Sequence, residues 1–526
     1  MRQLLLCLAA FLAFTVAFGQ TTFQKTYGGT GNDFAKCVLQ TSDGGYLIAG
    51  STTSYGAGGS DAYLIKTDNL GGILWTQTSG GTGGESFNSI IQASDGNFVL
   101  TGLTWVGSDS FELLICKKSI TGSTLWSKSF GIVDNENGVK VLQTPDGGFI
   151  VAGGTFSYAT GNQDIYLIKT DANGNTLWSK KFGGTGQEII FDLKQTLDGG
   201  FIIAGETTSY GPQTGLLFKI NALGNTQWCK TFGGGFGDWG RSVLQASDGG
   251  FIIVGGTASF GVGYVDVLFI KTDSNGNLLW SKTYGDAGYN QGTYVLQTAD
   301  GGYIIAGVTD DITNGLFKTA SLIKTDPNGD TLWAKSYNDS LFTWLFYIKQ
   351  TVDGGFITCG STYYNVSGPN INSDVYLIKT TPNGSSGCDE NSRSLSITNP
   401  NLPYSTQTLQ VSSGGGNASS PPTTMGSGGS ETIFCFASAV NEVDVQNQIN
   451  VFPNPFSTET TLQTDWILKN ATLTLYNSFG QAVKSIDNLY GPSITLHRDN
   501  LPIGLYFIRI TQGSEIFSAD KLVILD

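Results

Sequence analysis

Two sets of acidic side chains recur along the sequence at nearly constant spacing. One set stands seven residues before a repeated glutamine and comprises Asp33, Glu85, Glu136, Glu188 and Asp238. The other stands five residues before a repeated lysine and comprises Asp61, Glu112, Asp164, Asp266 and Asp374. A ring of carboxylates could bind calcium or polarise a sugar, and a pair could hydrolyse a glycosidic bond. The structural alternative is that each carboxylate accepts hydrogen bonds from backbone N–H groups of a neighbouring loop.

Several aromatic residues depart from the repeating pattern and form the second group of candidates. They are Trp105, Trp239, Trp344, Tyr363 and Tyr364. Exposed rings could stack on the faces of sugars or be buried by a protein partner. The alternative is that they fill the core of an irregular repeat. Trp239, Trp344, Tyr363 and Tyr364, together with the first acid set, are the predicted ligand-binding residues.

The scarce residue types exclude several kinds of chemistry. His497 is the only histidine, so no Ser-His-Asp or Cys-His arrangement and no His-ligated zinc site can form in the preceding residues. A sialidase-like site needs a cluster of arginines, and Arg241 is the only arginine of the repeat region. The net charge of −14 argues against nucleic acid as a partner. No metal or cofactor is predicted, but calcium stays open, because residues 171–175 resemble a calcium loop without its closing glutamate.

The chain contains seven copies of one unit. The pattern Q-x-x-D-G-[GN]-[YF] begins at Gln40, Gln92, Gln143, Gln195, Gln245, Gln297 and Gln350. Each copy is followed by a segment close to L-I-K-T-D, and six are followed by a tryptophan strand. Each unit predicts four strands joined in part by tight Asp-Gly turns. Four strands in about 50 residues, repeated seven times, predict a seven-bladed β-propeller over residues 20–388, with both acid sets on one face.

The seventh unit lacks its fourth strand, and the N-terminal region can supply it. Residues 22–29 align with residues 177–184, and Phe23 takes the place of Trp178. We expect this strand to pair with the segment around Tyr376, which closes the ring and removes free sheet edges. The alternative, an open solenoid, has no need of complementary ends. The units resemble a broad group of secreted bacterial β-propeller repeats with G-x-T and D-x-x-G-x-x-x-W motifs, a resemblance that implies a fold rather than an activity.

Residues outside the repeats point to export. Residues 1–19 carry one positive charge and an apolar run, which predicts a secretory signal peptide. No other apolar stretch reaches the ~18 residues of a membrane helix, so no membrane span is expected. Residues 389–446 are rich in Gly, Ser and Pro and predict a linker. Cys388 and Cys435 bracket most of it, and an oxidising compartment favours a disulfide between them.

The last region, residues 447–526, predicts a small Ig-like β-sandwich. It contains F-P-N-P-F at 452–456, L-Y-N-x-x-G-Q at 475–481, G-L-Y-F at 504–507 and K-L-V at 521–523. In this order the motifs resemble the type A C-terminal sorting domain of the type IX (Por) secretion system of Bacteroidetes. The resemblance implies that the sorting motifs include Pro453, Asn454, Pro455, Gly480, Gly504, Tyr506 and Lys521. The alternative is a sandwich that binds carbohydrate.

The resemblance implies passage through the periplasm to the outer-membrane surface or the extracellular space. The partners it implies are the type IX secretion machinery and surface lipopolysaccharide. From the propeller we expect a binding or adhesion module for a glycan or a protein ligand. The alternative function is a carboxylate-dependent enzyme that acts on extracellular polysaccharide.

Overall fold

The computed structural model describes residues 21–525, except for 108–109, 132–133, 158–161, 311–317, 338–341, 365–371, 414–423, 439–448, 478–481 and 513–514. The predicted signal peptide and Gly480 lie outside the described residues. The chain divides into two compact units, one spanning Gln20–Ser438 and the other containing Ala439–Asp526. Each unit is described by itself.

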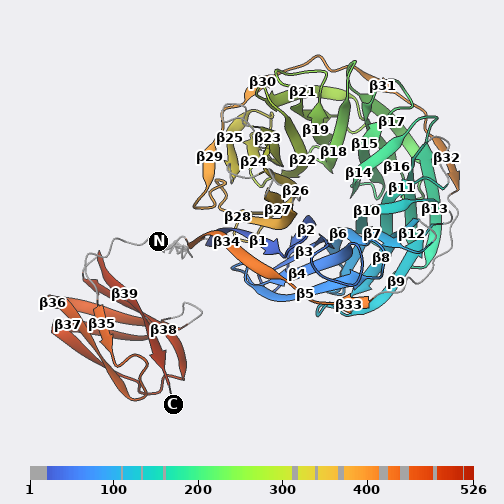
Figure 1. Cartoon of the computed structure of the whole chain (residues 1–526). Coiled ribbons are helices and arrows are strands. Elements are labelled where there is room, and N and C mark those ends of the chain that lie inside the picture. The colour runs from blue at the N-terminus through green and yellow to red at the C-terminus, as the bar shows by residue number, and fades with distance from the viewer. Residues whose placement is uncertain are drawn as a thin grey trace, which may run out of the picture. The chain divides into compact units, whose positions relative to one another are not determined.

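The first unit is a ring of seven antiparallel blades, as the sequence predicted (Figure 1). Blade 1 comprises β2 (Asp33–Gln40), β3 (Tyr46–Thr52), β4 (Asp61–Thr67) and β5 (Ile73–Gly80). Blade 2 comprises β6 (Ser86–Gln92), β7 (Phe98–Trp105), β8 (Phe111–Lys118) and β9 (Thr124–Phe130). Blade 3 comprises β10 (Glu136–Gln143), β11 (Phe149–Thr155), β12 (Asp164–Thr170) and β13 (Thr176–Gly183). Blade 4 comprises β14 (Glu188–Gln195), β15 (Phe201–Thr207), β16 (Thr214–Ile220) and β17 (Thr226–Phe232).

The remaining blades follow the same order. Blade 5 comprises β18 (Asp238–Gln245), β19 (Phe251–Thr257), β20 (Asp266–Thr272) and β21 (Leu278–Gly285). Blade 6 comprises β22 (Asn290–Gln297), β23 (Tyr303–Asp310), β24 (Lys318–Thr325) and β25 (Thr331–Tyr337). Blade 7 comprises β26 (Phe342–Gln350), β27 (Phe356–Tyr364), β28 (Asn372–Thr380) and, from the other end of the repeat region, β1 (Thr21–Gly28).

The ring closes through β1, which confirms the predicted complementary ends. β1 pairs antiparallel with β28, with Phe23 opposite Lys379 and Thr26 opposite Tyr376. Elsewhere in the ring, the tryptophan of one blade packs on the hairpin glycine of the next. A Cβ on Gly174 would lie 2.9 Å from the Trp126 ring, and one on Gly71 would lie 3.0 Å from the Phe23 ring. Phe23 therefore occupies the tryptophan position at the closing junction.

A lysine–aspartate pair explains why two of the repeated motifs occur together. In every blade the lysine of the L-I-K-T-D-like segment forms an ion pair with the aspartate of the Q-x-x-D-G motif. The pairs are Lys66–Asp43, Lys117–Asp95, Lys169–Asp146, Lys219–Asp198, Lys271–Asp248, Lys324–Asp300 and Lys379–Asp353. Each pair ties the turn between the first two strands to the third strand of its blade.

The interpretation of residues 389–446 as a linker is corrected for the described residues up to 438. This segment, here called the belt, forms short strands that add a fifth strand to six blades (Figure 1). These strands are β29 (Glu390–Ser392), β30 (Ser396–Thr398), β31 (Tyr404–Thr406), β32 (Gln410–Ser413), β33 (Thr424–Gly426) and β34 (Ser430–Ser438). They pair in turn with β25, β21, β17, β13, β5 and β1, so the belt runs around the ring in the reverse of the blade order.

The belt is held by apolar contacts as well as by backbone hydrogen bonds. Leu402 and Leu409 are buried in the blade cores, and Leu395 packs against a third core cluster. These leucines lie seven residues apart, so that each packs against a different core cluster. Each is followed two residues later by an apolar residue that pairs with an outer strand, as Tyr404 pairs with Phe232. The belt therefore covers edges that would otherwise be open for pairing with other chains.

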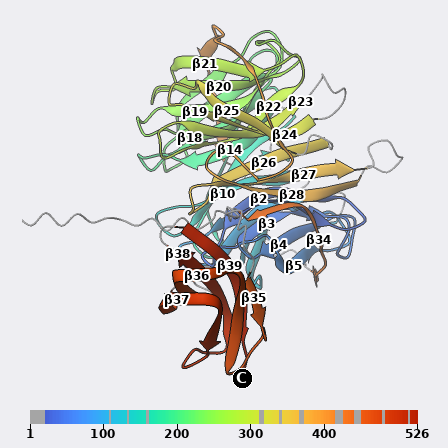
Figure 2. The same cartoon turned by 90° about the vertical axis from the view of Figure 1, so that its left-hand side faces the viewer.

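The second unit is a five-stranded β domain (Figure 2). Its strands are β35 (Ile449–Phe452), β36 (Glu459–Asn477), β37 (Ala482–His497), β38 (Gly504–Gln512) and β39 (Glu515–Ile524). The first part of β36 pairs with β35 and the last part with β38, with register shifts against β37 between these parts. The bent strands enclose a core of Leu462, Leu473, Ile508 and Leu522. Within the described residues, no helix is long and apolar enough to cross a membrane.

Candidate functional site

The innermost strand of every blade carries a β-bulge at the same position. The bulged residue stands three positions after the first-set acid or its replacement, and it has no partner in the ladder with the second strand. The seven bulged residues are Lys36, Asn88, Val139, Phe191, Arg241, Thr293 and Phe346. A bulge turns the extra residue away from the regular pleat. The same backbone feature thus recurs seven times with a varied set of side chains.

The glycine of each G-x-T motif makes the bulge possible. Opposite the bulge in blade 1, a Cβ on Gly50 would lie 1.7 Å from the carbonyl oxygen of Phe34. In blade 7, a Cβ on Gly360 would lie 1.8 Å from the carbonyl oxygen of Trp344. The equivalent glycines of the other five blades make the same close approach, at 1.8 to 2.1 Å. Only glycine leaves room for the carbonyl, so this motif residue fixes the inner-strand geometry.

All seven bulged residues line one cavity of about 300 Å³, to which every blade contributes. Lys140, Gln291, Tyr294, Trp344 and Tyr347 complete the described lining. This volume is at the lower end of the range for small-molecule sites in proteins. The cavity is therefore the candidate functional site of the ring.

Two cations of this cavity lie against aromatic rings. Lys36 Nζ lies 4.5 Å from the ring centre of Phe346, and Arg241 Cζ lies 3.9 Å from the ring centre of Phe191. With its amide oxygen turned toward them, Gln291 accepts hydrogen bonds from Trp239 Nε1 at 2.6 Å and Arg241 Nε at 2.9 Å. Burial, followed by the positive charge of Arg241, lowers the pKa of Lys36. The two cations thus share one poorly solvated space.

A buried aspartate lies beside the cavity. Asp192 is 3.1 Å from Lys194 Nζ and 3.5 Å from Lys140 Nζ, and it accepts a hydrogen bond from Ser242 Oγ at 2.9 Å. Burial acts to raise the pKa of Asp192, but the two ammonium groups outweigh it and leave the pKa below its ordinary value. Asp192 is therefore ionised, and its charge is paired with the ammonium groups of Lys140 and Lys194.

The aromatic part of the lining comes mainly from β26 and β22. The rings of Trp344 and Phe346 are stacked, with centres 6.1 Å apart and 12° between their planes. The ring centres of Tyr294 and Tyr347 lie 4.3 Å apart, and Lys140 Nζ lies 4.9 Å from the Tyr347 centre. Such a surface can contact the flat face of a ring-shaped ligand.

The structure brings only some of the predicted aromatic residues to the cavity. Trp344 lines it, and Trp239 reaches its edge through Gln291. Tyr363 instead packs edge-on against Phe342, with ring centres 5.0 Å apart. The side chain of Tyr364 lies outside the described part of the structure. Trp105 packs on Phe111, with ring centres 5.1 Å apart, and so fills its own blade.

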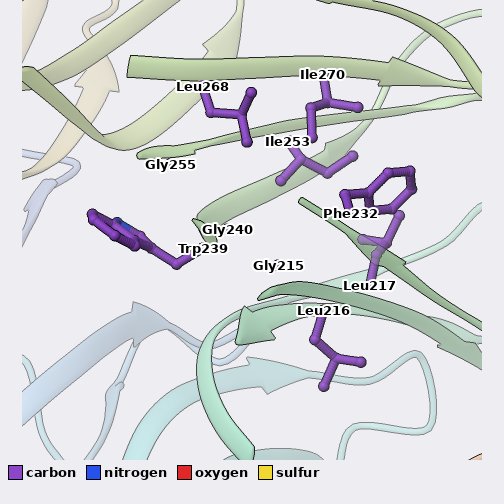
Figure 3. A pocket seen from close by; sticks show the side chains of 10 residues that line it. All are labelled: Gly215, Leu216, Leu217, Phe232, Trp239, Gly240, Ile253, Gly255, Leu268 and Ile270. Atoms are coloured by element: carbon purple, nitrogen blue, oxygen red, sulfur yellow. The ribbon is translucent and has the colours of Figure 1, made fainter. Parts of the chain in front are cut away.

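Trp239 also borders a second, much smaller void. This void of about 10 Å³ lies between blades 4 and 5, beside Gly215 and Gly240 (Figure 3). Leu216, Ile253 and Leu268 contribute apolar walls. A space of that size holds at most about one water molecule. It is a packing defect beside two glycines and offers no ligand site.

The first-set acids Asp33, Glu85, Glu136, Glu188 and Asp238 are buried, and none is among the lining residues of the cavity. They accept hydrogen bonds from nearby loops. Asp33 accepts from Gly29 N at 2.9 Å and Ser54 Oγ at 2.6 Å. Glu188 accepts from Gly184 N at 2.7 Å and Thr207 Oγ1 at 2.6 Å. These are the contacts expected of the loop-anchoring alternative.

Pairs of acids also meet where neighbouring blades join. A Cβ on Gly80 would lie 2.3 Å from Asp61 Oδ1 and 2.4 Å from Glu85 Oε2. Burial raises the pKa of both carboxyls, and the charge of Asp61 adds to the rise at Glu85. Across the described residues, no group of three His, Cys, Asp or Glu side chains is placed to hold a metal ion.

The hairpin at 171–175 forms a turn from its own residues. Asp171 Oδ1 accepts from Asn173 N and Asn175 N, both at 2.8 Å. The carboxylate is thus engaged by the backbone of the turn that it begins. This pattern is the usual use of Asp at the first position of a turn.

Sequence reasoning missed Lys36, Arg241, Phe191 and Phe346 as site residues. One signal could have found them. The position three residues after the first-set acid holds six residue types in seven repeats, whereas the glycine of G-x-T opposite it is constant. A constant glycine within a strand indicates a bulge or a close backbone approach. The bulged position opposite this glycine differs between repeats, which indicates that folding of the repeat does not require a particular side chain there.

In the second unit, the predicted sorting motifs hold the two chain ends of the domain together. Asn454 Oδ1 accepts a hydrogen bond from Val523 N at 2.9 Å, and Pro453 O accepts one from Thr460 Oγ1 at 2.7 Å. Tyr506 is buried and donates to Pro502 O at 2.8 Å. Pro455 belongs to the same loop, Gly504 begins β38, and Lys521 in β39 lies opposite Phe507.

Comparison with known proteins now decides the nature of this unit. Residues 450–525 match the family described as the secretion system C-terminal sorting domain. This end of the chain carries a type IX sorting domain. The sorting domain directs the protein through the periplasm to the cell surface or the extracellular space. The comparison with curated proteins gives no match.

Solved structures resemble the chain in fold alone. PorZ of Porphyromonas gingivalis, a surface component of the type IX secretion system, is 10% identical, with a TM-score of 0.39. That match covers 95% of this chain and 60% of the PorZ chain, so the chain spans less than two thirds of PorZ. A puromycin hydrolase is 15% identical, with a TM-score of 0.33, and the match covers 64% of this chain and 50% of the hydrolase. These similarities carry no argument about activity.

Proposed function

We propose that the propeller is an extracellular binding module whose central cavity holds one small unit of a larger ligand such as a glycan. The observation that carries the proposal is the ring of seven bulged residues. The same β-bulge in every blade places a different kind of side chain in one shared cavity. Residues that a repeat fixes serve folding, whereas residues that it leaves free are available for specificity. The stacked, partly buried rings of Trp344 and Phe346, which both line the cavity, favour a ring-shaped ligand.

The alternative, a carboxylate-dependent hydrolase, has less support. Glycoside hydrolysis uses two carboxyl groups that flank the scissile bond. The described lining of the cavity includes no Asp or Glu. Asp192, a buried carboxylate beside the cavity, forms ion pairs with Lys140 and Lys194. Binding without turnover is therefore the better reading of this arrangement.

A glycan array and a hydrolysis screen with the full exported chain separate the two functions. We expect binding without release of reducing ends, and loss of binding in Trp344→Ala. Tyr264→Ala is the matched control, because Tyr264 is a 79% exposed aromatic residue outside the cavity lining. Turnover that is lost in Asp192→Asn would favour the hydrolase. Absence of both binding and turnover would overturn the proposal.

We further infer that a disulfide between Cys388 and Cys435 fastens the end of the belt. Gln24 of β1 lies opposite Cys435 in the ladder, and its side chain donates a hydrogen bond to Cys388 O at 2.5 Å. Both cysteines thus lie next to one residue. The other described cysteines, Cys37, Cys116, Cys229 and Cys359, are buried and free. Peptide mapping without reduction tests the pair, and separate Cys388 and Cys435 peptides in the exported protein would refute it.

A further inference from the structure

Three donor groups around the cavity have N–H groups for which the described residues show no acceptor. In the described part of the chain, Asp192 forms its ion pairs with Lys140 and Lys194, and Glu206 acts on Arg241 electrostatically. Lys36 lies over the rings of Phe346 and Phe34, and Arg241 lies over the Phe191 ring and donates to Gln291. The third donor is Trp344 Nε1, which is buried with no hydrogen-bond partner among the described groups. A buried donor without an acceptor is costly, so Trp344 Nε1 calls for an acceptor from outside the chain, and Lys36 and Arg241 in the same cavity lining can donate to the same group.

The local charge has the opposite sign to that of the chain. The chain carries a formal net charge of −14, yet the cavity gathers Lys36, Lys140 and Arg241. Lys140 shares the single charge of Asp192 with Lys194. Glu206 is the nearest acid to influence Arg241, and its own side chain bonds to Gln213. Positive charge is therefore left over in the cavity.

Leaving two cations together in a confined space has an energetic cost. Burial and, after it, the positive charge of Arg241 lower the pKa of Lys36. A bound anion would relieve this repulsion and would gain strong, charge-assisted hydrogen bonds. The arrangement is thus unfavourable when empty and favourable when an anion is present.

The geometry points to an anionic sugar as the ligand of this cavity. The sugar ring lies on the stacked faces of Trp344 and Phe346, and its carboxylate, sulfate or phosphate oxygens accept from Lys36, Arg241 and Trp344 Nε1. This inference rests on the proposed binding function and restricts the ligand to sugars that carry a negative charge. Arg241 suits such a group, because a guanidinium can bind two oxyanion oxygens at once. A cavity of about 300 Å³ admits a small unit of a longer polymer.

Calorimetric titration of the full exported chain tests the charge class. The probes are a galacturonic acid disaccharide, a sulfated galactose disaccharide, a phosphorylated galactose disaccharide and the neutral galactose disaccharide. We expect at least one anionic disaccharide to bind about tenfold or more tightly than the neutral one, which corresponds to one charge-assisted hydrogen bond of ~1.4 kcal/mol. The difference should shrink as salt is raised, because ions screen the attraction.

Variants assign the effect to the two cations. Lys36→Met and Arg241→Met keep most of the side-chain volume, and each should weaken anion binding about tenfold and lower the ratio of anionic to neutral affinity. Lys349→Met is the matched control, because Lys349 is an exposed lysine on the same strand as Trp344 and lies outside the cavity lining. Unchanged thermal unfolding of each variant confirms that it is folded.

The outcomes distinguish this inference from the proposed function. Equal binding of neutral and anionic probes, lost in Trp344→Ala and unchanged in Lys36→Met, would overturn the anionic class and keep a binding module. Anion binding that survives both Lys36→Met and Arg241→Met would also overturn the inference. Failure of all four probes to bind would overturn the inference, and with an empty glycan array it would overturn the binding module too.

Discussion

The carbonyl oxygen of Trp239 lies only 1.8 Å from the point that a Cβ on Gly255 would occupy. This close approach lies beside the β-bulge at Arg241, and the bulge places Arg241 in the lining of the central cavity. Six other blades repeat it with a glycine of their own. The position of the candidate site therefore depends on residues that never touch a ligand. The seven glycines fix the backbone of the inner strands, and the seven bulged residues, which differ between blades, line the cavity.

The first prediction is that Gly255→Ala disturbs both stability and the site. The added methyl group must displace the Trp239 carbonyl, which costs about 2 kcal/mol or more of unfolding free energy. Because Arg241 follows two residues later, ligand affinity should fall as well. Gly235→Ala is the control, since no atom lies within 4 Å of a Cβ there. Chemical denaturation of both variants is the measurement, and equal stabilities would contradict the role assigned to Gly255.

The second prediction concerns acid stability. Hydrogen bonds from Lys169 and Thr144 lower the pKa of Asp146 to about 2, and those from Lys219 and Thr196 do the same for Asp198. A carboxyl with a depressed folded-state pKa stabilises the fold above its unfolded pKa, and this contribution disappears as the pH falls. Melting temperature should therefore drop between about pH 4 and about pH 2.

A lysine variant isolates this effect. Lys169→Met should flatten the acid-side slope and lower stability at pH 7 by less than about 1 kcal/mol, because Asp146 is half-exposed and its ion pair is screened by solvent. Lys349→Met serves again as an exposed control. An unchanged slope in Lys169→Met would show that the pair does not account for the acid sensitivity.

The third prediction is that Asp61→Asn stabilises the ring at neutral pH. Asp61 and Glu85 meet over Gly80, and their folded-state pKa values are raised. A raised carboxyl pKa makes the charged form costly at pH 7, and stability is regained as the pH falls through that pKa. Asp61 accepts a hydrogen bond from Ala57 N at 3.1 Å. In the variant, the asparagine oxygen can accept the same bond while its NH₂ group faces Glu85.

The junction between blades 5 and 6 already contains an acid and an amide. A Cβ on Gly285 would lie 1.5 Å from Asp266 Oδ1 and 3.1 Å from Asn290 Nδ2. Asp61→Asn copies that combination, so we expect a gain of up to about 1 kcal/mol at pH 7 and a weaker pH dependence between pH 7 and pH 4. Thermal unfolding across this range is the measurement. A lower melting temperature at pH 7 would contradict the paired-acid account.

The fourth prediction concerns the belt. Leu402 is 2% exposed and packs into the core between blades 4 and 5, so Leu402→Ala should cost about 2–4 kcal/mol and speed proteolysis of residues 390–413. Ile397→Ala is the control, because Ile397 lies on the belt but is 40% exposed. Limited proteolysis followed by mass spectrometry reads out the belt. Equal cleavage in both variants would show that the leucines do not hold it.

The ring and its closure could be predicted from the sequence because both depend on local, repeated signals. The Asp-Gly turns, the tryptophan strands and the alignment of Phe23 with Trp178 each recur or match within the chain. The sorting domain could be predicted from ordered motifs such as Pro453-Asn454-Pro455. These signals describe backbone geometry and short-range pairing, which sequence patterns express well.

The belt and the cavity could not be predicted in the same way. Glycine, serine and proline around the belt indicated a linker, and the seven-residue spacing of Leu395, Leu402 and Leu409 has meaning only against the finished ring. The cavity residues come from seven separate blades, so no short segment contains them. The repeats pointed to the acids as site residues, whereas the proposed binding surface is formed by residues that differ from one repeat to the next.

A crystal structure of the exported protein soaked with the best anionic disaccharide tests the central claim most directly. The account predicts sugar density among the seven bulged residues, with its anionic group between Lys36 and Arg241 and its ring on Trp344. Density at the carboxylate-anchored loops of Asp33 or Glu188, with an empty central cavity, would contradict it.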